Sequence, residues 1–195
     1  MGILTGPEII SAVHREDLHI TPFEPGLVNP ASIDLRLGAG VAVYADWVYD
    51  AGGPLDAIRP MDRVLDAKSE PSMTRFLINS ISGLVLRPGI LYLMHTEERI
   101  CSTKYIPVLD GKSSIGRLGI QVHITAGYGD PGFDGQYTLE VTAMHPIRIY
   151  PGMRFCQMRF HEMKGAFQDY QKEGHYKGDA SRGAVASMAY KQFEP

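Results

Sequence analysis

The stretch Tyr137-Thr-Leu-Glu-Val-Thr-Ala143 decides the fold, because apolar and polar side chains alternate along it at every second residue. A period of two is that of a β-strand with one buried face. The face towards the core would carry the apolar members of the run, Tyr137, Leu139, Val141 and Ala143. A carboxylate in the middle of such a strand is costly if it is buried without a partner. Either the opposite face is wet, or Glu140 is held there for a chemical purpose.

Similar short apolar runs lie on both sides of this stretch, about every 8–12 residues. Turn signals separate them, at Arg87-Pro-Gly89, Asp130-Pro-Gly132 and Pro151-Gly152. This spacing predicts an all-β sandwich or barrel and not alternating βαβ units. The expected strands from the middle of the chain onward are 76–79, 84–86, 90–94, 105–109, 120–125, 136–143, 147–150 and 153–160.

The first quarter of the chain predicts one helix and two more strands. Thr5 and Glu8 form a T-x-x-E capping box, and an apolar stripe follows it, so a short N-terminal packing helix should begin after Thr5. Strands are expected at 32–37 and 41–48. Residues 49–75 are polar and irregular, which is typical of an excursion from the sheet.

Length and composition favour one domain over residues 1–195, with 165–195 as a glycine-containing tail that could be an arm over a ligand. The net charge of −3 argues against a general nucleic-acid binder. No apolar run reaches the ~20 residues of a membrane span, and the first residues lack the pattern of a signal peptide, so a cytoplasmic protein is expected. Cys101 and Cys156 cannot form a disulfide framework, and no zinc motif with C-x-x-C is present.

The densest cluster of polar groups is Asp110-Gly-Lys-Ser-Ser-Ile-Gly-Arg-Leu-Gly119. It resembles the end of a P-loop, but Ile106 stands where that motif needs glycine, so we reject a Walker site. Ser113 or the serine after it could cap a short helix, with Lys112 before it and Arg117 on the same face. These groups suit a polyphosphate; a capped surface turn is the alternative.

The segment His123-Ile-Thr-Ala-Gly-Tyr-Gly-Asp-Pro-Gly-Phe-Asp-Gly135 holds four glycines within residues 127–135. Such density indicates sharp turns or close approach of the backbone to a ligand. Asp130 is either a turn former or a binding group. His123 is either a packed core histidine or a catalytic one.

Together these motifs resemble the signature of the dCTP deaminases of the dUTPase-like superfamily. Val28-Asn-Pro-Ala-Ser-Ile-Asp-Leu-Arg-Leu-Gly38 and Tyr150-Pro-Gly-Met-Arg-Phe-Cys-Gln157 extend the resemblance over roughly residues 5–160. The resemblance implies a mainly β fold, a distorted β-barrel or jelly-roll of the dUTPase-like type with a short N-terminal helix and a mobile C-terminal tail. It also implies a homotrimer with sites between subunits.

The resemblance also implies roles for single residues. Glu140 would be the proton shuttle, with Arg117 and Ser113 near the reacting base and the carbonyl near Ala126 orienting the attacking water. The binding loop from a neighbouring subunit would be Lys112, Ser113, Ser114, Ile115, Gly116 and Arg117. Asp130 would accept from the sugar 3′-hydroxyl. Further contacts would come from Thr138, Leu139, Gln157, Tyr170 and, in the tail, Lys177.

The tail departs from the family pattern, since His175 and Asp179 stand where lysine and glutamine are common. The family reaction is zinc-independent hydrolysis of dCTP to dUTP and ammonia, with Mg²⁺ carried by the triphosphate and dTTP as a possible feedback inhibitor. A bifunctional enzyme that continues to dUMP, a plain dUTPase and a nucleotide-binding regulator are the alternatives. Glu140 argues against a plain dUTPase, and the intact set of motifs argues against the regulator.

Overall fold

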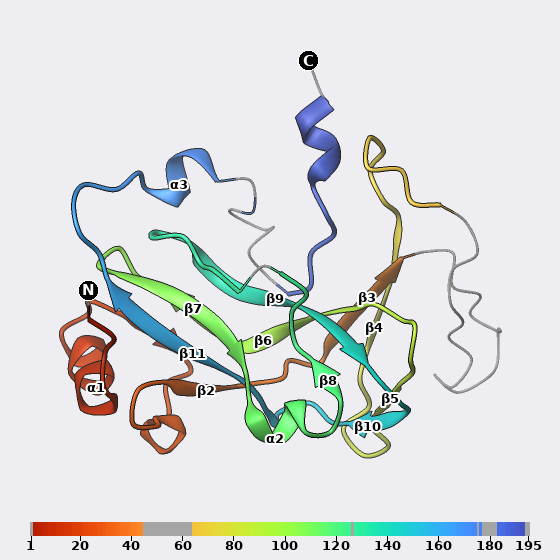
Figure 1. Ribbon diagram of the computed structural model, residues 1–195, viewed down its shortest axis with the longest axis horizontal. Helices are drawn as coiled ribbons and strands as arrows, with labels where there is room; N and C mark the ends of the chain where they lie inside the picture. Colours follow the sequence, from red (N-terminus) through yellow and green to blue (C-terminus); the bar gives the residue numbers. More distant parts are fainter. Residues whose placement is uncertain (1, 45–63, 126, 175, 177–182, 194–195) are drawn as a thin grey trace.

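Strand β9 (Asp134–Ala143) forms where the period of two predicts it, and its odd-numbered residues from 135 to 143 are buried while the even-numbered ones are half-buried. The computed structural model describes residues 2–44, 64–125, 127–174, 176 and 183–193. The prediction of a mainly β chain is confirmed (Figure 1). The remaining strands are β1 (His19–Thr21), β2 (Ile33–Arg36), β3 (Gly40–Tyr44), β4 (Met73–Leu77), β5 (Leu84–Leu86), β6 (Tyr92–Cys101), β7 (Tyr105–Gly111), β8 (Ile120–Gln121), β10 (Ile147–Ile149) and β11 (Arg154–Glu162).

The described strands form three sheets. The largest has the order β4-β3-β6-β9-β8, with β1 paired to β6; a second has the order β2-β11-β7; β10 and β5 form a third. Every pairing between these strands is antiparallel. Within the part of the chain that the structure describes, no sheet closes on itself, so the molecule is built of open sheets and not of one closed barrel.

The core lies between the large sheet and the β2-β11-β7 sheet. Leu139 and Val141 of β9 are fully buried, as are Phe155 and Phe160 of β11. Burial of large apolar side chains of this kind stabilises each by about 1.5–3 kcal/mol. No helix among the described residues is long and apolar enough to cross a membrane.

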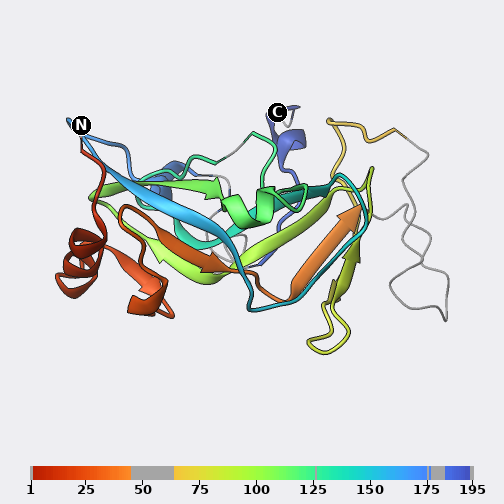
Figure 2. The ribbon, with the colours of Figure 1, turned by 60° about the horizontal axis from the view of Figure 1, so that its bottom comes forward.

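Helix α1 (Gly6–His14) lies at one end of the molecule, and β3 and β4 lie at the other (Figures 1 and 2). Thr5 is the N-cap as predicted, but its side chain makes no capping hydrogen bond. The predicted capping box is therefore wrong, because the Thr5 side chain does not make the hydrogen bond that defines it. Glu8 contacts Arg15 at 2.6 Å instead, one ion pair along the helix surface.

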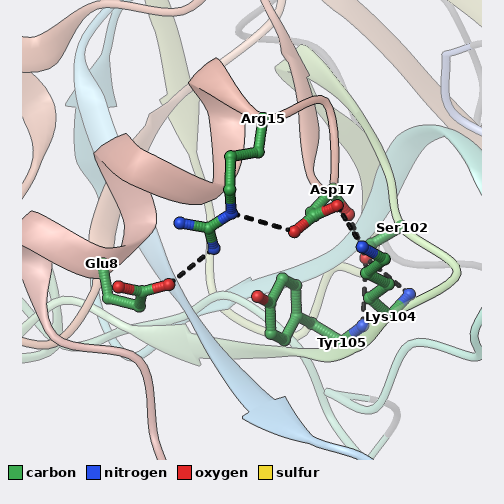
Figure 3. A network of polar contacts seen from close by, with 6 residues as sticks. All are labelled: Glu8, Arg15, Asp17, Ser102, Lys104 and Tyr105. Carbon is green, nitrogen blue, oxygen red and sulfur yellow. Dashed lines mark hydrogen bonds and ion pairs between the residues drawn. The ribbon is translucent and has the colours of Figure 1, made fainter.

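A polar network joins the end of α1 to the turn between β6 and β7 (Figure 3). Asp17 pairs with both Arg15 and Lys104. The Ser102 hydroxyl donates to the Asp17 carbonyl oxygen at 2.9 Å, and it accepts from the amides of Lys104 and Tyr105. These contacts fix α1 against the sheet through backbone groups that would otherwise lack partners.

Several predicted boundaries are wrong. Strand β6 continues seven residues beyond the predicted run 90–94, and β8 is two residues long where 120–125 was expected. The tail holds two short helical turns, α3 (Tyr170–Glu173) and a 3₁₀ turn at Ala189–Phe193, where no regular structure was expected. Residues 45–48 of the predicted strand 41–48 lie outside the described residues.

Candidate functional site

A cavity of about 460 Å³ lies on the face of β9 that carries the polar side chains. Its walls come from β3, β6, β9, the 124–133 loop and the tail. Four of the predicted site residues line it, namely Asp130, Thr138, Glu140 and Tyr170. The cavity therefore combines two carboxylates with a mostly apolar and aromatic wall, which is the usual character of a small-molecule site.

Glu140 is half-buried and its carboxylate is held in place. The backbone amide of Ile124 donates to its Oε2 at 2.8 Å. On the neighbouring strand β6, Leu93 pairs with Glu140 in the strand register and also lines the cavity. The carboxylate therefore has a backbone donor and lies at the cavity wall, and its chemical purpose stays a prediction.

Three aromatic rings brace the end of the cavity where Asp130 lies. Phe133 packs edge-to-face on Tyr137, with ring centroids 5.0 Å apart, and on Tyr170, with centroids 5.6 Å apart. Burial raises the pKa of the Tyr137 and Tyr170 phenols, and the nearby Asp130 carboxylate raises both further. Both hydroxyls therefore stay neutral at physiological pH.

The loop above these rings needs glycine at two positions. A Cβ on Gly129 would lie 2.3 Å from the Tyr137 hydroxyl oxygen, and Gly132 has a φ of +85°. The loop is also tied to β7, because Leu109 donates to the Gly127 carbonyl at 2.6 Å. The positive φ of Gly132 agrees with the sharp turns predicted from the glycine density, whereas close approach of the backbone to a ligand stays a prediction.

The C-terminal tail crosses the same face of the sheet. The Gly183 amide donates to the Gln136 side chain at 2.9 Å, and the Val185 amide donates to the Thr138 hydroxyl at 3.3 Å. Val185 and Ser187 line the cavity. The tail therefore forms one wall of the site that holds Glu140.

The 112–117 loop lies elsewhere in the same chain. Helix α2 (Ser113–Gly116) is at the lower edge of the molecule in Figure 1, well apart from α3 and the tail at the upper edge. Ile115 is buried in the core, while Ser113, Ser114, Gly116 and Arg117 are exposed, and none of them lines the cavity. The predicted serine cap is wrong, since Lys112 is the N-cap and no side chain caps this helix.

Lys112 and Gln157 are both engaged with protein groups. The Lys112 ammonium lies 2.7 Å from a carboxylate oxygen of Asp34. Gln157 donates to the Gly111 carbonyl at 3.0 Å and accepts from the Ser32 hydroxyl at 2.9 Å.

The other predicted site residues divide into two groups. Leu139 is fully buried, so its side chain belongs to the core and only its backbone is available to a ligand. Ala126 and Lys177 lie outside the described residues. In the described ranges no three His, Cys, Asp or Glu side chains gather so as to hold a metal ion.

The sequence did not reveal several parts of the cavity wall. Tyr44, Leu91, Leu93, Gln136 and Tyr176 line it and come from segments far apart in the chain. Gln136 had a local signal, because it shares the alternating face with Glu140. No sequence pattern indicates the Ile124 amide that donates to Glu140, because every residue except proline carries the same backbone donor.

Comparison with known proteins gives one consistent result. The model of the dCTP deaminase-like family matches residues 3–163. A relative from Leptospira biflexa, called "dCTP deaminase, dUMP-forming", is 41% identical over 98% of both chains. A relative of the same description from Cytophaga hutchinsonii is 40% identical over 98% of this chain and 99% of its own.

A solved structure is similar in fold. The 2′-deoxycytidine 5′-triphosphate deaminase of Agrobacterium tumefaciens matches with a TM-score of 0.60 at 24% identity. The match covers 88% of this chain and 53% of that one. At this identity the likeness concerns the fold alone.

Proposed function

Because the chain belongs to the dCTP deaminase-like family, we propose that it is an enzyme that deaminates dCTP and carries the product on to dUMP. One observation carries the proposal: a carboxylate, Glu140, is held by a backbone amide in a cavity wide enough for a nucleotide. The names of the relatives from Leptospira and Cytophaga favour dUMP over dUTP as the final product. This agrees with the bifunctional enzyme that the sequence offers as an alternative.

In the deamination step, water adds to C4 of the cytosine ring and Glu140 accepts one of its protons. Glu140 passes that proton to ring N3 as the tetrahedral intermediate forms. It then takes the remaining proton from the new C4 hydroxyl and delivers it to the exocyclic amine, which leaves as ammonia while the C4 carbonyl of uracil forms. One positioned carboxylate can serve as base and then as acid in this way. The Ile124 amide holds the carboxylate in the cavity that receives the ring.

In the second step, water attacks the α-phosphorus of dUTP, and pyrophosphate leaves with dUMP as the other product. Asp130 is the second carboxylate of the cavity wall, and it orients that water or binds the sugar hydroxyl. Magnesium enters with the triphosphate, as part of the substrate. Its charge lowers the cost of bringing the polyphosphate near these two carboxylates.

The site is shared between copies of the chain. Glu140, Asp130 and Tyr170 line the cavity, whereas Ser113 and Arg117 stand on a different side of the same molecule. If both sets contact one nucleotide, the second set must come from a neighbouring copy. A homotrimer with closed symmetry supplies each cavity with one such neighbour. The tail wall at Val185–Ser187 then covers the nucleotide from the cavity's own chain.

Product identification tests the proposal. The protein is incubated with dCTP and Mg²⁺, and ammonia, dUTP, dUMP and pyrophosphate are quantified by enzymatic assay and chromatography. We expect one ammonia, one dUMP and one pyrophosphate for each dCTP consumed. Ammonia with dUTP as the end product would reject the second step, and cleavage of added dUTP without ammonia from dCTP would reject the first.

A further inference from the structure

Lys112 stands directly before α2, and its charge is already matched within the chain. Its ammonium lies 2.9 Å and 2.7 Å from the two carboxylate oxygens of Asp34. Asp34 belongs to β2, 78 residues earlier in the sequence. The ion pair thus ties the start of the 112–117 loop to a strand of the β2-β11-β7 sheet.

The environment of Asp34 makes this pair hard to separate. The Asp34 side chain is only 1% exposed, and Asn29 donates to it at 2.8 Å. Arg154 lies 3.7 Å away, but its own side chain is 54% exposed. A lysine that moved away to a phosphate would leave a buried carboxylate with weak compensation, which is one of the costliest arrangements in a protein.

The residue before Lys112 is held as well. Gln157 of β11 pairs directly with Asp34 across the strands, and its amide nitrogen donates to the Gly111 carbonyl. The Ser32 hydroxyl occupies the other end of that amide. Gly111 and Lys112 are therefore both fixed from the sheet, while the serines and Arg117 after them remain exposed.

We propose that Asp34 and Lys112 are positioning residues, and that the lysine acts on the nucleotide through the placement of α2 and not as a ligand of the triphosphate. The inference rests on the proposed function, since it takes the 112–117 loop to be part of the nucleotide site. It changes the role of Lys112 and Gln157 from contacts of the substrate to supports of the loop. Ser113, Ser114 and Arg117 are then the groups of this loop that meet the nucleotide.

A double-variant cycle tests the proposal. Lys112→Met removes the charge and keeps the stem, Asp34→Asn removes the need for that charge, and the third protein carries both changes. We expect Lys112→Met to lower Tm and to raise the KM for dCTP by about tenfold or more, because a misplaced loop weakens binding. The double variant should recover most of the Tm and most of the KM. If Lys112→Met fails to fold, a folded and active double variant still supports the coupling.

The opposite assignment predicts a different pattern. If Lys112 binds the triphosphate directly, the double variant recovers Tm but keeps the high KM of Lys112→Met, and the salt dependence of KM becomes weaker than in the wild type. Either result overturns the proposal. The proposal is also overturned if the change in Tm of the double variant equals the sum of the changes of the two single variants, because the two positions are then not coupled.

The chain offers a matched control in a second lysine–aspartate pair, Lys104 and Asp17. Lys104 precedes β7, whereas α2 follows the other end of that strand. Lys104→Met, alone and with Asp17→Asn, should leave the KM for dCTP unchanged. The activity of the wild type separates the proposed function from the proposed role of Lys112: if the wild type does not convert dCTP, the proposed function fails. The Tm cycle then still decides whether Asp34 holds Lys112.

Discussion

At the scale of single residues, Glu140 combines a position that the sequence reveals with a contact that it hides. The period of two puts Glu140 on the polar face of β9, and its place in the cavity follows from that alternation. The donor that orients the carboxylate is the amide of Ile124, 16 residues earlier. No property of a side chain marks that amide, so only folding of the loop onto the strand brings it there.

Glu140→Gln tests the proton shuttle. The glutamine carbonyl oxygen can still accept from the Ile124 amide, so dCTP should bind with nearly unchanged affinity. Glutamine cannot take or return a proton, and kcat should fall by about 10²–10⁴-fold. Ammonia release under saturating dCTP measures the change, with the exposed Glu70→Gln as control. A variant at position 140 that keeps wild-type turnover would remove Glu140 from the mechanism.

At the scale of elements, the length of β6 depends on a bulge that no sequence pattern announced. The polar run after His95 predicts the end of a strand, yet β6 continues to Cys101. The register with β9 shifts between His95 and Arg99, and the extra residues turn Glu98 into the interior. There Glu98 is fully buried and accepts from the backbone amide and the Nε of Arg36, at 2.8 Å and 2.7 Å. Arg36, on strand β2, thus compensates the cost of burying the Glu98 charge.

Glu98→Ala should lower the free energy of unfolding by about 3–5 kcal/mol, because it leaves the largely buried Arg36 without its main partner. Glu97→Ala is the matched control. The Glu97 carboxylate is 3.6 Å from the Arg36 Nε but 40% exposed, so its loss should cost less than about 1 kcal/mol. Urea unfolding at matched protein concentration measures both. Equal losses for the two variants would show that burial is not what makes the pair matter.

The network at the end of α1 predicts a pH dependence. Hydrogen bonds from Lys104 and then Arg15 lower the pKa of Asp17 below its ordinary value of 3.8. A lowered pKa in the folded state means that the charged form stabilises the fold above about pH 4, and that this stabilisation is lost as pH falls through the folded-state pKa.

Asp17→Asn should therefore be less stable than the wild type at pH 7, and the gap should narrow as the pH falls below about 4. Urea midpoints measured at pH 7 and pH 3 give the comparison, and Glu70→Gln is the control without this network. A gap that stayed constant from pH 7 to pH 3 would contradict the assignment.

Other elements show where sequence patterns reach their limit. Strand β2 was predicted from alternation, yet Asp34 is buried along with its apolar neighbours, because a lysine 78 residues away neutralises it. The tail lacks periodicity, and the amides of Gly183 and Val185 are held by the side chains of Gln136 and Thr138 of β9. Long-range partners decide both cases, and a local pattern cannot contain them.

At the scale of the whole molecule, the sequence predicted the mainly β class and the family, both of which are confirmed. The predicted site residues divide between two places in the chain, and their roles stay predictions. Asp130, Thr138, Glu140 and Tyr170 meet in the cavity, while Ser113, Ser114 and Arg117 stand apart on α2. That a second copy of the chain brings the two sets together stays a prediction.

Mixing two inactive variants tests the shared site. Glu140→Gln and Arg117→Ala each spoil every site of a pure oligomer. When the two are co-expressed or refolded together, a trimer places intact Glu140 from one copy beside intact Arg117 of another in about a quarter of its sites. Ammonia release from dCTP should return to about that fraction of the wild-type rate. Mixtures as inactive as the parents would mean that each chain builds its site alone.

The ion pair between Asp34 and Lys112 also bears on how this chain can evolve. Loss of either charge alone leaves the other without its partner, and the Asp34 carboxylate lies in the interior. We therefore expect a chain with only one of the two charges to be less fit than a chain with both or a chain with neutral residues at both positions. Mutational drift at these positions is therefore expected to proceed in concert, the two sites substituting together across lineages even though 77 residues separate them along the gene.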